Sequence, residues 1–164
     1  MLLKTMLFAA GALAFTATGA LAQSAAAPSP HSATDPFTYK SDKDLEGMAI
    51  KPGVAGPTLG TLSDHENYYV LLVGRTETGE PEFHAHWIDY GIVQEGRGSL
   101  VYGGTDTGSR DTGNGELRGG TISGGVTRDL DPGDYFEIPA SQWHQITLKS
   151  GTKAFRYIVV KVRQ

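Results

Sequence analysis

Short runs of β-branched and aromatic residues, separated by turn residues, dominate the chain from Asn67 to its end. The turn signals return at intervals of roughly 8–12 residues, which is typical of all-β barrels and sandwiches. This part of the chain carries no convincing helical period. The runs cover residues 68–75, 82–88, 90–94, 99–104, 119–130, 134–139, 143–148 and 153–162. We therefore expect an all-β fold, either an antiparallel β-barrel or a sandwich.

One segment between these runs has no apolar residue to anchor it. Residues 105–116 read TDTGSRDTGNGE and are expected to form a mobile loop. The glycine-rich residues 115–125 overlap its end but lack the lysine followed by serine or threonine that a phosphate-binding loop has. Tight turns at the corners of a barrel explain these glycines better.

The N-terminal residues have the organisation of a targeting signal. Lys4 precedes an apolar run from about Met6 to Leu21, and small residues follow in an Ala-x-Ala pattern that ends at Ala22. This is the build of a secretory signal peptide. We expect residues 1–22 to be removed and the mature protein to be periplasmic or secreted. The chain has no cysteine, so a lipoprotein attachment is excluded.

The remainder divides into a linker and one domain. Residues 23–45 are rich in Ala, Ser, Pro and Thr and show no helical or strand period, so we expect a flexible linker. Residues 46–164 then form one domain of about 120 residues, enough for a single core.

Composition limits the ligands and partners that the domain can have. Without cysteine, a metal ion would have to be held by imidazole and carboxylate groups. The formal net charge is −4 and the basic residues are scattered, so we expect no nucleic-acid partner. We expect no membrane partner once the signal peptide has been removed.

Two of the 5 histidines of the chain, His84 and His86, stand in one predicted strand. Residues i and i+2 of a strand point to the same face, so both imidazoles could reach one metal ion. Asp89 is at odd spacing and joins them only if the strand bends or breaks near Trp87–Ile88. A lone His-x-His pair is weak evidence, because exposed strand histidines also produce it.

A second candidate stretch lies near the C-terminus, GDYFEIPASQWH (133–144). Together with HAHWIDYGIVQEG (84–96), it resembles the two signature motifs of the cupin superfamily, in the family order and over residues 46–164. Gly133, Pro139 and His144 fall on the second family motif at its spacing. At two other positions this chain departs from that motif, with Ser141 in place of glycine and Leu148 in place of asparagine.

The first family motif is matched at His84 and His86. Four residues separate Gly79 from His84, where the family has five. Asp89 stands where the family has a glutamate, one methylene shorter and one or two residues earlier, and six residues separate it from Gly96 as in the family.

The resemblance implies a cupin β-barrel, or jelly roll, with a metal site made of His84, His86, Asp89 and His144. Such nitrogen and oxygen ligands suit Mn, Fe, Ni, Cu or Zn, and the sequence does not choose among these divalent ions. The resemblance also implies a homodimer. Two alternatives stay open: a barrel that has lost its metal, and an Asp89 that is only a strand-end residue.

Residues that share a face with these ligands would form the rest of the pocket. Gly91 and Val93 share the face of Asp89, while Ile146 and Leu148 share that of His144 and would supply apolar walls. Glu82 shares the face of His84 and is a candidate partner of the metal ligands or an acid/base group. The alternative for Glu82 is an exposed carboxylate at a sheet edge.

Two kinds of function are compatible with this site. In the first, the chain is an enzyme in which the metal acts on a small polar organic molecule. Resemblance to cupins allows dioxygenase, isomerase and lyase chemistry and fixes none of them. The enzyme would need a group that moves protons, for which Glu82, Tyr102 and Tyr135 are candidates. In the second, the chain is a non-catalytic module that binds or senses a small molecule or a metal.

Overall fold

The computed structural model describes residues 37–48 and 58–164. The predicted signal peptide and most of the predicted linker lie outside the described residues. The end of the predicted linker, residues 42–45, belongs to a short helix, α1 (Asp42–Gly47). Ser41 caps this helix with Asp44 in a reciprocal capping box. Within the described ranges, no helix has the length and apolar character that crossing a membrane requires.

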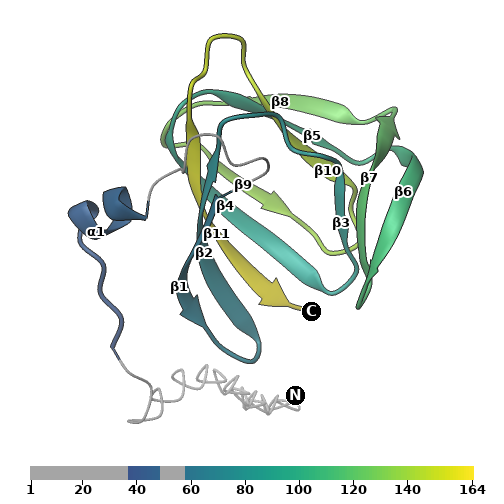
Figure 1. Cartoon of the computed structure of the whole chain (residues 1–164). Coiled ribbons are helices and arrows are strands. Elements are labelled where there is room, and N and C mark those ends of the chain that lie inside the picture. The colour runs from purple at the N-terminus through teal and green to yellow at the C-terminus, as the bar shows by residue number, and fades with distance from the viewer. Residues whose placement is uncertain (1–36, 49–57) are drawn as a thin grey trace, which may run out of the picture. The chain divides into compact units, whose positions relative to one another are not determined.

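The rest of the described chain forms two antiparallel sheets that face one another (Figure 1). The first sheet has the order β1-β2-β11-β4-β9, and the second has the order β6-β7-β3-β10-β5-β8. The strands are β1 (Thr58–Asp64), β2 (Tyr68–Arg75), β3 (Glu82–His84), β4 (Trp87–Glu95), β5 (Gly98–Tyr102), β6 (Thr105–Gly113), β7 (Glu116–Ser123), β8 (Val126–Leu130), β9 (Tyr135–Ile138), β10 (His144–Leu148) and β11 (Phe155–Arg163). The all-β antiparallel prediction is confirmed, but in the described part of the chain the two sheets are not closed into a barrel.

Most of the predicted strands are present, but the mobile loop expected at residues 105–116 is not. The run at residues 68–75 is β2, whereas β1 was not predicted. The expectation of a loop at residues 105–116 is wrong, because these residues form most of a hairpin of β6 and β7. Asn114 and Gly115 turn the chain between the two strands, both with positive φ, and such a pair is a strong hairpin signal. The absence of apolar residues marked an exposed hairpin, since an exposed ribbon needs no apolar anchor.

The hydrophobic core lies between the inner faces of the two sheets. On β11 the side chains alternate, so that Phe155, Tyr157 and Val159 are buried while the residues between them are only partly buried. These three residues belong to one core cluster with side chains from both sheets, including Val93 of β4 and Ile146 of β10. The alternation places the next inward position of β11, residue 161, at the end of this core.

Gly91 of β4 makes room for an aromatic ring in that core. It lies opposite Phe136 of β9, and a Cβ added at Gly91 would overlap the Phe136 ring. Gly91 thus shares the inward face of Asp89, as the sequence indicated. The ring of Phe136 fills the space that a side chain at residue 91 would occupy. We expect Gly91→Ala to lower the free energy of unfolding by about 1–3 kcal/mol, as overpacking does in cores.

Urea unfolding would measure this loss, with Gly47→Ala as the control, because a Cβ at Gly47 meets nothing within 4 Å. Equal stability of the Gly91 and Gly47 variants would contradict the packing described for Phe136.

Candidate functional site

A cluster of polar and charged side chains fills the space between the sheets beyond the core. Glu82 and His84 come from β3 and His144 from β10 of one sheet, whereas Asp89 of β4 and Lys161 of β11 come from the other. Four of these residues are almost fully buried, with exposed fractions of 3% for His84, 4% for His144, 6% for Asp89 and 8% for Lys161. Buried polar groups of this kind are stable only when they are paired or bind a ligand.

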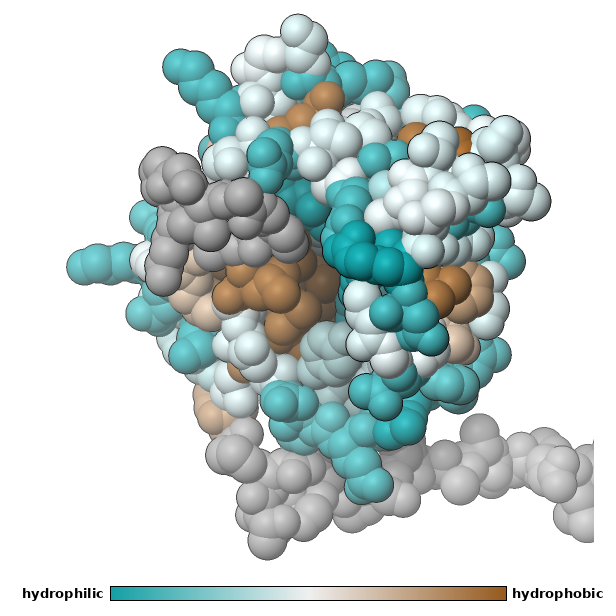
Figure 2. Space-filling view, turned by 45° about the vertical axis from the view of Figure 1, so that its right-hand side comes forward, coloured by the Kyte–Doolittle hydropathy of each residue, from teal (hydrophilic) through white to brown (hydrophobic). Residues whose placement is uncertain are grey.

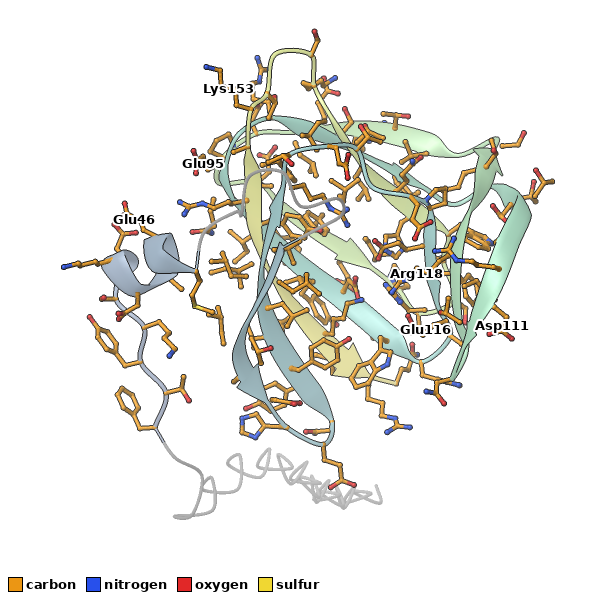
Figure 3. All side chains as sticks on the ribbon, viewed as in Figure 1. Glu46, Glu95, Asp111, Glu116, Arg118 and Lys153 are labelled. Carbon is orange, nitrogen blue, oxygen red and sulfur yellow. The ribbon has the colours of Figure 1, made fainter. Side chains whose placement is uncertain are left out.

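The strand register sets the neighbours within the second sheet. His144 lies opposite Glu82 across β10 and β3, and Glu82 lies opposite Arg118 of β7. Two positions further along β3, and so on the same face, His84 lies opposite Glu116. Glu116 and Arg118 extend from β7 into the space between the sheets, whereas Asp111 of β6 lies at the outer edge (Figure 3).

Hydrogen bonds set the orientation of both buried imidazoles. His84 Nδ1 lies 2.6 Å from Glu116 Oε2, and His144 Nδ1 lies 3.1 Å from the carbonyl oxygen of Gln142. Carboxylate and carbonyl oxygens only accept, so each Nδ1 carries the proton. In the neutral ring, the lone pair is then on Nε2, which in both residues faces the cluster. Metal-binding histidines commonly donate their other ring N–H to such a partner.

His144 is uncharged at neutral pH. Its burial lowers its pKa from 6.5 to about 4, and the nearby negative charges of Asp89 and Glu82 offset only part of this effect. The neutral ring is the form that can bind a metal ion.

Glu82 lies between the two histidines and two arginines. Its Oε2 atom is 3.6 Å from His84 Nε2 and 4.0 Å from His144 Nε2. Arg75 and Arg118 also contact its carboxylate, at 3.0 and 2.7 Å. Burial acts to raise the pKa of Glu82, but the positive charges of Arg118 and Arg75, which both donate to its carboxylate, outweigh it and bring the pKa well below its usual range. Glu82 is therefore an ionised acceptor at neutral pH.

The first sheet contributes an ion pair. Asp89 and Lys161 lie directly opposite each other across β4 and β11. Lys161 Nζ donates to both carboxylate oxygens of Asp89, at 2.6 and 2.7 Å, and lies 2.7 Å from His84 Nε2. The lysine therefore links the two sheets through the same nitrogen of His84 that faces the cluster.

The donor atoms of this cluster fit a small divalent ion. One atom each from Glu82, His84 and His144 lies within 4.8 Å of the others. Asp89 Oδ2 is a fourth neighbour, 3.6 Å from His84 Nε2 and 3.9 Å from His144 Nε2. Metal–ligand bonds of about 2.0–2.2 Å need donors roughly 3–3.5 Å apart, so these atoms would move closer together around an ion. The nitrogen and oxygen donors present thus suit a divalent metal ion.

The structure does not bring His86 to this cluster. The premise that His84 and His86 project from one strand is wrong, because β3 ends at His84 and residues 85–86 form a bend. Backbone hydrogen bonds hold the bend, from Ala85 N–H to the Gly115 carbonyl and from Gln164 N–H to the His86 carbonyl. His86 is exposed, with its ring beside Gly115. The same bend turns Asp89 inward, which the sequence analysis required for Asp89 to join the site. The bend lies at residues 85–86 and not near Trp87–Ile88, where it was expected.

Sequence reasoning missed four residues of the site, namely Arg75, Glu116, Arg118 and Lys161. For Lys161 a signal was present, since it continues the inward series of Phe155, Tyr157 and Val159 at a period of two residues. A lysine on the apolar face of a strand is unusual enough to suggest a buried partner. Arg75 gives the same signal, since it follows Leu71 and Val73 at a period of two residues on β2, whereas Glu116 and Arg118 have no such apolar series around them.

A cavity of about 640 Å³ adjoins the cluster and is lined by side chains of two kinds. Apolar residues line one part of it, including Val73, Phe136 and Ile146, and the charged cluster lines another. Figure 2 shows hydrophobic side chains in a hollow of the surface beside hydrophilic ones. Sites for small organic ligands commonly have such volumes and such a mixed lining.

Tyrosines line the cavity, but not those that the sequence suggested. Tyr102 and Tyr135 are exposed side chains, and neither lines the cavity. Tyr69 and Tyr157 do line it. Burial and the charges of Asp89 and Glu116 raise the pKa of Tyr69 to about 12, so its hydroxyl stays protonated at neutral pH.

Comparisons with known proteins show similarity at the level of the fold. No protein-family model matches the chain, and no curated protein matches it. A conserved protein with a double-stranded β-helix domain from Klebsiella pneumoniae is 17% identical to this chain. The match covers 72% of this chain and 85% of the Klebsiella chain, with a TM-score of 0.52. BH2720 from Bacillus halodurans is 16% identical, and the match covers 80% of this chain and 84% of BH2720, with a TM-score of 0.55. KdgF from Halomonas is 16% identical, and the match covers 79% of this chain and 96% of KdgF, with a TM-score of 0.50.

Proposed function

The chain has the double-stranded β-helix fold of the cupin superfamily, and from this fold and its site we propose that it binds one divalent metal ion and a small organic molecule beside it. The ligands in this proposal are Glu82, His84 and His144, with Asp89 as a fourth. The metal identity is left open among Mn, Fe, Ni, Cu and Zn, because all of them accept nitrogen and oxygen ligands.

The observation that carries the proposal is the arrangement of the two imidazoles. Both are buried, both donate Nδ1–H to an oxygen that fixes the ring, and both turn Nε2 toward the carboxylates of Glu82 and Asp89. Two buried imidazoles that served only to fill space would not need lone pairs directed at the same point. A metal ion uses both lone pairs together.

The cavity supports the second half of the proposal. A molecule with a polar end could place that end at the cluster and its apolar part against Val73, Phe136 and Ile146. When bound, the metal would act as a Lewis acid toward the polar end. The chain itself would orient the molecule and exclude water from one side of it.

Binding without catalysis is the second candidate. Glu82 is the carboxylate best placed to move a proton, but Arg75 and Arg118 hold it and its pKa lies well below its usual range. Such a carboxylate is a weak general base. Mass spectrometry of a small molecule after incubation with the metal-loaded protein would separate the two candidates, since catalysis alters the molecule and binding leaves it unchanged.

Titration of chelator-treated protein with Zn²⁺, followed by calorimetry, tests the metal site. We expect one equivalent to bind. Removing a hydrogen-bond partner of a metal ligand commonly weakens binding about 10- to 100-fold, so removing the ligand itself in His144→Ala should weaken it by about a hundredfold or more. Glu82→Gln is expected to weaken binding as well.

His86→Ala is the matched control, because His86 is exposed and lies outside the cluster. We expect this variant to bind Zn²⁺ as the wild type does. Loss of binding in His86→Ala, or full binding in His144→Ala, would show that the ligand set is wrong.

Export and dimerisation remain predictions from the sequence. The signal-like residues 1–22 support export, to the periplasm or the medium, and the resemblance to cupins supports a homodimer.

A further inference from the structure

Lys161 is a buried cation that contacts two of the four groups proposed to hold the metal. Its Nζ lies 2.7 Å from His84 Nε2 and within 2.7 Å of both carboxylate oxygens of Asp89. An ammonium group only donates, so each contact uses a lone pair that a metal ion would also need. We propose that Lys161 occupies the cation position beside His84 and keeps the metal affinity low until its ammonium group is displaced. This inference rests on the metal-binding function proposed above.

The fold holds Lys161 in this position. Its side chain points inward because it continues the alternation of β11, and the register of β11 with β4 puts it opposite Asp89. It is 8% exposed, so water does not compete strongly for the ammonium group. The contact with His84 is therefore part of the packing between the two sheets, unlike the position of a long side chain on the surface.

The charges around the site are already balanced when Lys161 is present. Glu82, Asp89 and Glu116 supply three negative charges, and Arg75, Arg118 and Lys161 supply three positive ones. Both histidines are neutral in the hydrogen-bond arrangement described above. A divalent ion would add two positive charges to this neutral network, and an uncompensated charge is unfavourable in a buried site.

Displacement of Lys161 would remove both obstacles at His84. It would return the Nε2 lone pair of His84 and both oxygens of Asp89 to the metal, and it would take one positive charge away from the ion. Two cations that share ligands a few ångströms apart repel strongly in a site of low polarity. Metal affinity in this protein should therefore depend on Lys161 as well as on the ligands.

Calorimetric titration with Zn²⁺ at one neutral pH, using chelator-treated full chain, tests this. We expect Lys161→Met to lower the Kd by about tenfold or more, because it frees the lone pair and removes the charge. Lys149→Met is the control: Lys149 is paired with Asp129 at the surface, away from the cluster, and its loss should leave the Kd unchanged. Titration with Co²⁺ adds a second readout, since its absorption spectrum reports the number of ligands.

Lys161→Gln guards against misfolding of the methionine variant. Its amide can still donate to Asp89 but carries no charge, so we expect its Kd for Zn²⁺ to lie below that of the wild type as well. If both variants are folded and bind Zn²⁺ no more tightly than the wild type, while His144→Ala still weakens binding, Lys161 does not compete and the metal function stands. If neither the wild type nor either Lys161 variant binds Zn²⁺ or Co²⁺, the inference and the proposed function both fail.

Discussion

Lys161→Met is expected to lower the free energy of unfolding of the metal-free protein by about 3–5 kcal/mol, the usual effect of removing one partner of a buried ion pair. The reason is that Asp89 stays behind, 6% exposed, with its carboxylate no longer paired with a cation. Urea unfolding at neutral pH, in the presence of a chelator, would measure the loss.

The double variant Lys161→Met with Asp89→Leu distinguishes the effect of the ion pair with Asp89 from the effect of the other contacts of Lys161. Replacing both members of a buried ion pair by apolar residues is often neutral or stabilising, so we expect this variant to recover most of the lost stability. A double variant as unstable as Lys161→Met would show that the lysine stabilises the fold through its packing or through His84, and that its charge pairing with Asp89 matters little.

The metal-free protein is also expected to lose stability as the pH falls from about 6.5 to about 4. Burial lowers the pKa of His144 to about 4 in the folded protein, whereas the unfolded chain takes up the proton near 6.5. Because the unfolded state binds more protons in this window, the free energy of unfolding falls as the pH drops through it. A difference of about 2.5 pKa units corresponds to about 3 kcal/mol.

Urea unfolding of chelator-treated protein across this pH range would measure the slope. His144→Leu should flatten it by the contribution of one proton, and the control His86→Ala should keep it. Identical slopes in the wild type and His144→Leu would show that His144 is not held neutral by its surroundings. Glu82 adds to the loss at the lower end of the range, because its pKa also lies below its usual value in the folded state.

The fold and part of the site could be predicted because their signals are local. The apolar runs that became β2, β10 and β11 are visible in short windows, since alternation and turn residues act between near neighbours in the chain. His84 and His144 were found because each stands inside a motif with glycine or proline at set distances.

Other features depended on how far a strand extends, which local patterns define poorly. The run EFHAHWI looks like one strand, and the same-face argument for His86 depended on its continuing. It breaks after His84 because hydrogen bonds from Gln164 and to Gly115, both remote in the sequence, hold the bend. The hairpin of β6 and β7 was missed for the opposite reason, since its Asn114-Gly115 turn was visible but its strands carry no apolar pattern.

The sequence by itself determined that the chain is all-β, and it indicated His84 and His144 as candidate metal ligands, which the structure places in one buried cluster. Only the tertiary structure decided what surrounds them: the placement of Lys161 opposite Asp89 and against His84, and of Arg118 and Glu116 beside Glu82 and His84. The physical reason is register. Which side chains meet across two strands, or between two sheets, depends on pairings between residues far apart in the chain, such as His84 and Lys161, which are 77 positions apart, and no short stretch of sequence encodes such a pairing.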